Sequence, residues 1–233
     1  MDIKQFRYSS DNLGYLVYSG DTGIAIDGGA VDETLLFADR NNISIRIITN
    51  THSHYDHTPG NKELLKRTSG EFLDPGKIRS DQTVAIGKEV LNIFHAPGHT
   101  LDSIIFWTDD FLVTGDTLFN GTVGNCFSND FNAFFNSLKR VIAFPGSTRI
   151  YAGHDYVEES LEIAGAIDTG NPDIEKYMKK YNPHGEIVST LEDELKVNPY
   201  IRFNEKGMIE KLKARRLPVD TEFERFKSIM ENY

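Results

Sequence analysis

One seven-residue run in this chain concentrates side chains that bind metal ions. Thr51-His52-Ser53-His54-Tyr55-Asp56-His57 contains three of the seven histidines in the 233-residue sequence, with an aspartate among them. Imidazole nitrogens and carboxylate oxygens are the usual protein ligands of zinc and related divalent metals. A solvated polar loop rarely has this composition, so we interpret the run as a set of metal ligands. The candidates are His52, His54, Asp56 and His57.

The residues before this run indicate where it lies in the fold. Residues 45–49 are apolar and mostly β-branched, which is typical of a buried strand. The ligands would then follow the carboxyl end of that strand, the edge where open α/β sheets place their sites. His52 and His54 project to the same side of an extended segment, whereas Asp56 and His57 come where the chain turns. The first pair can therefore bind one metal ion and the second pair another.

Three further candidate ligands follow three further strand-like segments. Each case has the same form, a short apolar strand, a glycine and then one ligand-type residue. The candidates are His99 after Val90–Phe94, Asp116 after Phe111–Val113 and His154 after Arg149–Tyr151. With the first run they give five histidines and two aspartates, enough for two metal ions that share one carboxylate.

This set of motifs resembles the metallo-β-lactamase superfamily, and more closely its glyoxalase II, or hydroxyacylglutathione hydrolase, family. The pattern His-x-His-x-Asp-His at 52–57 and the single ligands after later strands carry the superfamily resemblance. Residues 189–203 resemble a late signature of glyoxalase II that most superfamily members lack, and Asp11–Val17 resembles the first strand of that family. The late stretch reads Ser-Thr-Leu-Glu-Asp-Glu-Leu-Lys-Val-Asn-Pro-Tyr-Ile-Arg-Phe.

The resemblance implies an α/β fold, with an αββα metallo-β-lactamase-like sandwich as the catalytic domain over residues 1–160. Residues 161–233 would form a helical C-terminal region that binds substrate. The hydrophobic spacing agrees, because strand-like runs alternate with helices up to about residue 160 and strand signals are absent after it. The predicted helices are residues 31–41, 61–68, 130–144, 157–166, 172–181, 191–196, 205–213 and 221–230.

The resemblance also implies a chemistry, hydrolysis of S-D-lactoylglutathione or a related S-acylated small thiol to a hydroxy acid and free thiol, as in methylglyoxal detoxification. A hydroxide that bridges two divalent ions would attack the thioester carbonyl; zinc is expected, although iron and manganese suit the same ligands. Asp56 could also orient this hydroxide, so Asp56 and Asp116 are the expected catalytic residues. The expected ligands are His52, His54 and His99 for one ion, Asp56, His57 and His154 for the other, and Asp116 for both.

Substrate recognition is where the chain departs from that family. Members usually have a lysine that contacts glutathione in the loop after the bridging aspartate, and Asn125 stands in that place here. The family's C-terminus also has an arginine and a lysine two or three residues apart. Arg225 and Lys227 lie in the corresponding part of this chain but do not align with them convincingly. Tyr156 matches the family and is expected beside glutathione, and Phe127 is expected to face the same pocket. The thiol is therefore glutathione, bound weakly, or a different small thiol.

Charge and cysteine content disfavour several other classes of function. The formal net charge is −10, and nucleic-acid binding draws most of its affinity from cationic contacts with phosphates. No apolar run is long enough to span a bilayer, and the N-terminus lacks the pattern of a signal peptide. The single cysteine, Cys126, cannot form an internal disulfide, so we expect a cytoplasmic protein. The only partner expected is the small thioester, and the oligomeric state stays open.

Two alternative functions stay open. A persulfide dioxygenase with one iron ion shares the superfamily motifs, but that branch lacks the signature at 189–203. A non-catalytic metal-binding module would be favoured if some of the seven expected metal ligands were absent, and all seven are present. Three other features are interpreted as structural: His95 as a hydrogen-bonded histidine outside the ligand set, His184 as a turn residue, and Lys211, Lys213, Arg215 and Arg216 as a solvated helix face.

Overall fold

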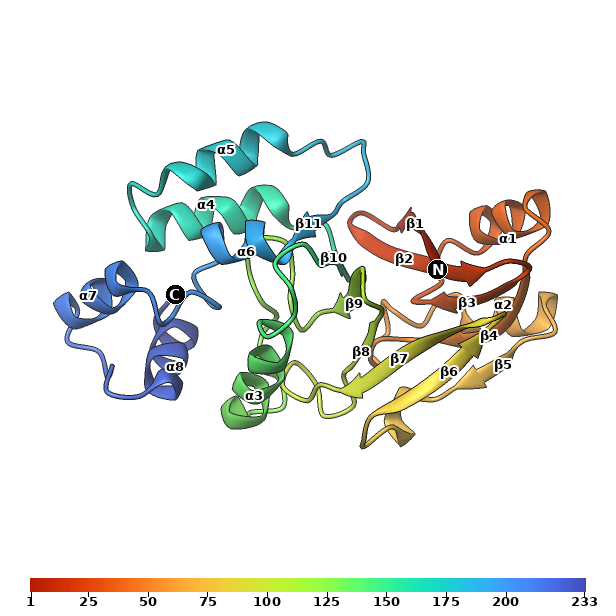
Figure 1. Cartoon of the computed structure of the whole chain (residues 1–233), viewed down its shortest axis with the longest axis horizontal. Helices are drawn as coiled ribbons and strands as arrows, with labels where there is room; N and C mark the ends of the chain where they lie inside the picture. Colours follow the sequence, from red (N-terminus) through yellow and green to blue (C-terminus); the bar gives the residue numbers. More distant parts are fainter.

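The computed structural model describes residues 1–233 as two β-sheets packed face to face, with helices on both outer sides (Figure 1). The first sheet has the strand order β1-β2-β3-β4-β5. Its strands are β1 (Asp2–Tyr8), β2 (Asn12–Ser19), β3 (Thr22–Ile26), β4 (Ser44–Thr49) and β5 (Glu71–Leu73). The second sheet has the order β11-β10-β9-β8-β7-β6. Its strands are β6 (Gln82–Ile86), β7 (Glu89–His95), β8 (Ile104–Trp107), β9 (Phe111–Gly115), β10 (Arg149–Ala152) and β11 (Ser189–Thr190).

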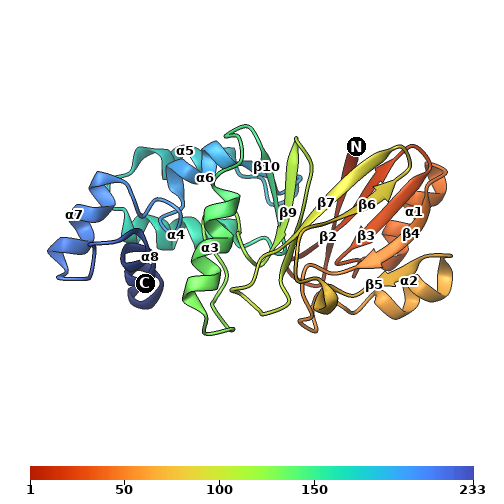
Figure 2. The same cartoon turned by 60° about the horizontal axis from the view of Figure 1, so that its bottom comes forward.

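Two helices flank the first sheet, and the other six lie on the side of the second sheet (Figure 2). The first two are α1 (Val31–Arg40) and α2 (Asn61–Arg67), and a short 3-10 helix follows at Pro75–Lys77. The others are α3 (Phe131–Val141), α4 (Val157–Ile167), α5 (Pro172–Lys180), α6 (Leu191–Val197), α7 (Lys206–Ala214) and α8 (Glu222–Asn232). None of these helices combines the length and apolarity that crossing a membrane requires.

Alternation along the strands explains why the first sheet buries both of its faces. Tyr15 and Val17 of β2 belong to the apolar core between the two sheets. Leu16, between them in sequence, points to the opposite face and packs in a cluster with Ala38 of α1 and Leu64 of α2. The predicted αββα sandwich is therefore confirmed.

The outer face of the second sheet is covered by α3 together with C-terminal helices. Ile105 of β8 and Leu112 of β9 share one apolar cluster with Phe134 of α3 and Phe226 of α8. The C-terminal helices thus complete a core that begins in the sandwich. The division at residue 160 stays a prediction, and α4 crosses that position.

All eight predicted helices are found, with ends within three residues of those expected, but two expectations about strands are wrong. Asp11–Val17 is not part of the first strand, because β1 precedes it and pairs with it antiparallel. β1 has an edge position and mostly polar side chains, so it lacks a buried-strand pattern. A strand also occurs after residue 160, since β11 pairs with β10. Two residues are too few for periodicity to reveal.

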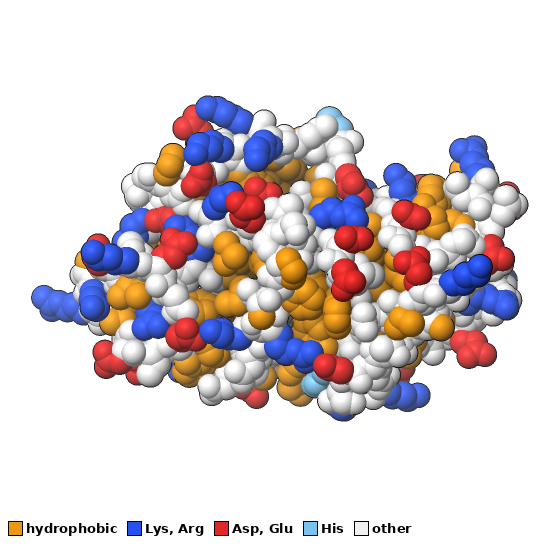
Figure 3. Space-filling view, viewed as in Figure 1, with side chains coloured by type: hydrophobic (Ala, Val, Ile, Leu, Met, Phe, Trp, Pro, Cys, Tyr) orange, Lys and Arg blue, Asp and Glu red, His pale blue; other side chains and the backbone are white.

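The predicted basic cluster lies on and after α7, where Lys and Arg side chains gather at the left end of the molecule (Figure 3). Lys213, Arg215 and Arg216 are exposed, as expected of a solvated face. Lys211 is different, because it is half-buried and forms an ion pair with Asp168. The cluster is therefore partly structural.

Candidate metal centre

The expected ligands come together because the strands that precede them run in the same direction. β4 is parallel to β3, and β9 is parallel to β10. β7 and β9 are both antiparallel to β8, so these two also end at the same edge. The loops that leave β4, β7, β9 and β10 carry residues 52–57, His99, Asp116 and His154 respectively.

The first ligand cluster consists of His52, His54, His99 and Asp116, with one donor atom from each within 4.8 Å of the others. Nδ1 of His54 lies 2.9 Å from Nε2 of His52 and 3.1 Å from Nε2 of His99. Oδ2 of Asp116 lies 3.9 Å from the same nitrogen of His52 and 3.5 Å from that of His99. Ligands about 2.0–2.1 Å from a tetrahedral zinc ion lie about 3.3 Å apart. These four atoms therefore surround a space that fits one ion.

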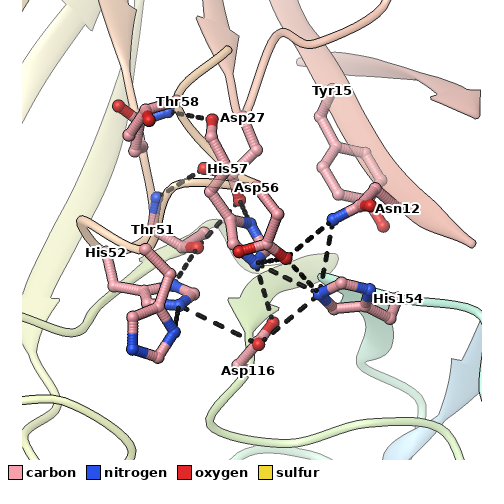
Figure 4. Close-up of polar contacts among 12 residues, drawn as sticks. Asn12, Tyr15, Asp27, Thr51, His52, Asp56, His57, Thr58, Asp116 and His154 are labelled. Atoms are coloured by element: carbon pink, nitrogen blue, oxygen red, sulfur yellow. Dashed lines mark hydrogen bonds and ion pairs between the residues drawn. The ribbon is translucent and has the colours of Figure 1, made fainter. Parts of the chain in front are cut away.

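The second cluster consists of Asp56, His57 and His154, and Asp116 closes it (Figure 4). Nε2 of His154 lies 3.2 Å from Nε2 of His57 and 3.2 Å from Oδ2 of Asp56. Oδ1 of Asp116 lies 3.4 Å from Nε2 of His57. The Asp116 carboxylate thus lies between the two clusters, with Oδ1 near His57 of the second and Oδ2 3.5 Å from His99 of the first and 3.6 Å from His154 of the second.

The far nitrogens of three of the histidines are within hydrogen-bond distance of protein groups, and that of His57 is in an ion-pair contact, as expected for metal ligands. His99 and His154 donate from Nδ1 to the Asn125 carbonyl oxygen and to Oδ1 of Asp11, at 2.9 and 2.8 Å. Nδ1 of His52 lies 3.1 Å from Oγ1 of Thr51, and Nδ1 of His57 lies 3.1 Å from Oδ2 of Asp27. These four rings therefore present Nε2 to a cluster. The fifth histidine, His54, presents Nδ1 instead.

An unpaired buried atom is further evidence that this donor set fits a cation. Asp116 is only 7% exposed, and its Oδ1 accepts no hydrogen bond within the protein, although His57 is near. Leaving such an oxygen unpaired costs free energy, which a bound divalent ion offsets. Imidazole and carboxylate suit zinc, iron and manganese alike, so the site binds divalent metal without specifying which.

The electrostatics of the metal-free clusters favour metal binding at His52, His99 and Asp116, whereas His57 is protonated there and must release a proton to bind an ion. Burial, assisted by the nearby charge of His57, lowers the pKa of His52 to about 2, which leaves a neutral imidazole. Burial lowers the pKa of His99 as well. Burial alone would raise the pKa of Asp116, but the surrounding imidazoles, His57 first among them, hold it below its usual range. Asp116 is therefore a carboxylate at neutral pH.

Asp27 is a further residue of the site and lies outside the expected ligand set. It follows β3, which is parallel to β4, so it reaches the same edge of the sheet. Its carboxylate accepts hydrogen bonds from the backbone N–H and the hydroxyl of Thr51, both at 2.8 Å, beside the contact with His57. Asp27 therefore fixes the start of the ligand loop and one ligand ring.

Two further supporting residues lie at the start of β2. Because β2 is antiparallel to β3, its first residues meet the carboxyl end of β3. Asn12 is buried and donates from Nδ2 to Oδ2 of Asp56 at 3.1 Å (Figure 4). Asp11 holds His154, as described above. A polar residue at a strand end was the only sequence signal, and strand order was needed to interpret it.

Comparison with known proteins decides the family. A sequence profile described as metallo-beta-lactamase superfamily matches residues 12–71, and one described as hydroxyacylglutathione hydrolase C-terminus matches residues 155–231. A hydroxyacylglutathione hydrolase of Idiomarina loihiensis is 34% identical over 225 residues, covering 90% of this chain and 89% of that protein. One of Pelagibacter ubique is 30% identical over 233 residues, covering 91% and 98%. The chain belongs to the hydroxyacylglutathione hydrolase family.

Solved structures agree with the fold of this hydroxyacylglutathione hydrolase family member. The crystal structure of ETHE1 from Myxococcus xanthus has a TM-score of 0.72 at 23% identity and covers 100% of this chain and 91% of that chain. The BLEG-1 B3 metallo-beta-lactamase has a TM-score of 0.64 at 17% identity, with coverage of 86% and 99%. At such low identities the likeness supports the fold alone.

The three expected substrate-binding residues of this family member all lie close to the ligand clusters. The Phe127 ring is 61% exposed and packs edge-on against His54 and His99, with ring centroids 5.6 and 5.3 Å away. The Tyr156 ring stacks on His154 at 4.8 Å. The Asn125 side chain is exposed, while its backbone carbonyl holds His99.

The two histidines interpreted as structural and the single cysteine lie outside both ligand clusters. His95 donates from Nε2 to the Leu101 carbonyl oxygen at 2.8 Å. His184 is exposed in the segment between α5 and β11. Cys126 lies close to the site in sequence, but the group near its Sγ is the Ser128 hydroxyl, at 3.6 Å. No base lies beside the thiol to activate it.

Proposed function

We propose that this chain hydrolyses the thioester of an S-acylated small thiol, such as S-D-lactoylglutathione, to a hydroxy acid and free thiol. The observation that carries the proposal is the place of Asp116, one carboxylate between two clusters of metal-binding side chains. A ligand shared between two clusters would hold two metal ions close together, as in two-metal hydrolytic sites, where the ions lie about 3.5–4 Å apart. The names of its relatives support a hydroxyacylglutathione substrate.

We assign His52, His54 and His99 to one divalent ion and Asp56, His57 and His154 to the other, with Asp116 shared. Zinc is our choice for both ions, because it binds imidazole and carboxylate without a need for redox chemistry. When bound, the two ions would provide hydroxide at neutral pH and polarise the thioester carbonyl.

The chain's own residues position the reactants. Asp56 is the more exposed of the two carboxylates, with 29% of its side chain accessible against 9% for Asp116. Asn12 holds one oxygen of Asp56 in place. We therefore assign Asp56 the role of orienting the attacking water. The departing thiolate has a free-thiol pKa of about 8.5, so no general acid is required.

A panel of thioesters that share an acyl group but differ in the thiol tests this function. We expect turnover of S-D-lactoylglutathione or of another small-thiol ester, and no oxygen consumption with glutathione persulfide. Oxygen consumption without thioester turnover would favour the persulfide dioxygenase. Neither activity in metal-loaded protein would favour a binding module.

Two metal ions per chain are the first quantitative expectation of this proposal. Each cluster supplies three ligands of its own and a share of Asp116, so both should fill together. Elemental analysis of protein purified without chelator should approach two equivalents of divalent transition metal. A firm value of one equivalent, with no gain when metal is added, would contradict the shared-ligand assignment.

We place the thiol carrier along Phe127, Tyr156 and Asn125, on the side of the clusters where these side chains lie. Residues 161–233 form the proposed substrate-binding region, and the single cysteine favours a cytoplasmic location. The cations near the C-terminus, Arg225 and Lys227, are already paired within the protein and are not free to bind the thiol carrier. Arg225 is held by Asn204 and by the Val219 carbonyl oxygen, and Lys227 pairs with Glu231.

Asn125→Lys should therefore lower KM for S-D-lactoylglutathione about tenfold, with kcat changed much less. A new charge-assisted hydrogen bond contributes about 1.5–3 kcal/mol. It would act on part of the substrate remote from the carbonyl, so most of the change should appear in KM. Steady-state kinetics at low and high salt measure it, because screening should weaken the gain.

Asn125→Met is the matched control, since it lengthens the side chain without adding a charge. Its KM should stay near that of the wild type. A lysine variant with an unchanged or raised KM would mean that residue 125 does not face the thiol carrier, or that the carrier is not glutathione.

A further inference from the structure

Glu194 is a fully buried carboxyl group for which the proposed chemistry has no use. It lies in α6, within the stretch 189–203, and is 0% exposed. Burial raises its pKa to about 7. A carboxyl group is rarely buried without a specific set of partners.

One oxygen of Glu194 binds the loop that follows the shared metal ligand, and the other binds a tyrosine of α5. Oε2 accepts the backbone N–H of Gly121 at 2.8 Å, and Oε1 accepts the hydroxyl of Tyr177 at 3.1 Å. Asn198, the residue that caps the end of α6, donates to the Thr122 carbonyl oxygen at 2.9 Å and also lies 3.3 Å from Glu194. The tip of the loop is therefore held by Glu194 of α6 and by Asn198 at the end of that helix.

The same loop continues directly to a ligand of the first cluster. Three residues beyond Thr122, the carbonyl oxygen of Asn125 accepts the Nδ1–H of His99. Gly124 lies so close to the ligands that an added Cβ would be 2.0 Å from the Asp116 carbonyl oxygen and 2.8 Å from Nδ1 of His99. A shift of the loop tip would therefore move the carbonyl that orients His99 and press Gly124 against the backbone of Asp116.

The helix that holds the loop is itself fixed to the second sheet. Thr190 and Asp193 cap the start of α6 reciprocally. The Leu191 N–H donates to the Thr148 carbonyl oxygen just before β10, at 2.8 Å. α6 therefore provides a rigid support rather than a mobile cover.

We propose that Glu194 and Asn198 are positioning residues of the metal centre, which hold the 117–125 loop so that Asp116 and His99 keep the geometry for metal binding. This gives the C-terminal helical region a role in the centre itself, in addition to substrate binding. The inference rests on the proposed metal centre, and its test separates the two.

The test compares the metal affinity of Glu194→Ala, Glu194→Gln and the wild type by competition with a chelator. Glu194→Ala should lose about tenfold in affinity and in kcat/KM, the lower end of what partners behind metal ligands contribute. The visible spectrum of cobalt-substituted protein should change, because the ligand field depends on ring and carboxylate orientation.

Glu194→Gln should restore affinity and spectrum to within about threefold of the wild type. Its amide oxygen can accept the Gly121 N–H, and the Tyr177 hydroxyl can rotate to accept the amide N–H. Asn198→Ala, which removes the bond to Thr122, should resemble Glu194→Ala and carries the test if that variant does not fold.

Asp168→Ala is the matched control. It removes another carboxylate of the helical region, one that binds Arg202 and Lys211 and touches no residue of the loop. It should lower thermal stability while metal affinity and the cobalt spectrum stay unchanged. Alanine variants of Glu194 and Asn198 that behave like Asp168→Ala would overturn the inference. A wild type that binds no metal would overturn the proposed centre instead.

Discussion

Asp116→Ala should remove both metal ions and lower kcat/KM by more than about a hundredfold, the upper end of what partners behind metal ligands contribute. Its Oδ1 lies 3.4 Å from Nε2 of His57 and its Oδ2 lies 3.5 Å from Nε2 of His99. The substitution therefore takes one ligand from each cluster. It also removes the negative charge that offsets repulsion between two dications. Elemental analysis and steady-state kinetics on one preparation measure both losses.

His95→Ala is the control for this prediction. His95 lies four residues before a ligand, but its Nε2 is engaged by the Leu101 carbonyl oxygen. Its removal should leave the metal content near two equivalents and change kcat/KM little. Equal metal loss from the two variants, with both proteins folded, would show that the ligand assignment is wrong.

The ligand clusters were predictable because the apolar residues just before each ligand indicate a strand. β9 is mostly apolar and buried throughout, and β7 has apolar side chains at four of its seven positions, so the positions of His99 and Asp116 after them carried structural meaning. Strands that run in the same direction end at the same edge of a sheet. Ligand-type residues that follow separate strands could therefore be expected to form one site. The helices were predictable for a similar reason, since apolar spacing and capping residues are local.

The supporting residues were not predictable, because their roles depend on strand order. Asn12 contacts Asp56, 44 residues away, only because β2 is antiparallel to β3. Glu194 belongs to a charged stretch, Leu191–Lys196, that is typical of a solvated helix. Only the packing of α6 against the 117–125 loop shows that this one carboxyl group is buried.

Asp27→Asn should remove metal from the second cluster selectively, with a loss of about ten- to a hundredfold in affinity there. Asp27 has a positive φ of 51°, which asparagine tolerates well, so the substitution changes charge without straining the backbone. The amide oxygen can still accept from Thr51, but the amide nitrogen cannot accept from His57. The ring of His57 would lose the partner that orients it.

The same substitution should change how stability depends on pH in the metal-free protein. Burial lowers the pKa of His57, but the carboxylates of Asp27 and Asp116 outweigh it and raise the pKa to about 11. Since this exceeds the ordinary value of 6.5, protonated His57 contributes stability that is fully present below pH 6.5 and lost as the pH rises toward 11. Urea unfolding across this range should show a flatter dependence for Asp27→Asn than for the wild type.

The two aspartates should therefore differ in stoichiometry and not only in the size of the loss. Asp116 faces both clusters, whereas Asp27 touches His57 of the second cluster and reaches the first only through the Thr51 hydroxyl. Asp27→Asn should retain about one equivalent of metal where Asp116→Ala retains none. Metal titration of the two variants beside the wild type measures this. If Asp27→Asn bound two equivalents with wild-type affinity, the contact with His57 would have no part in metal binding; if it bound none, the two clusters would fill only as a unit.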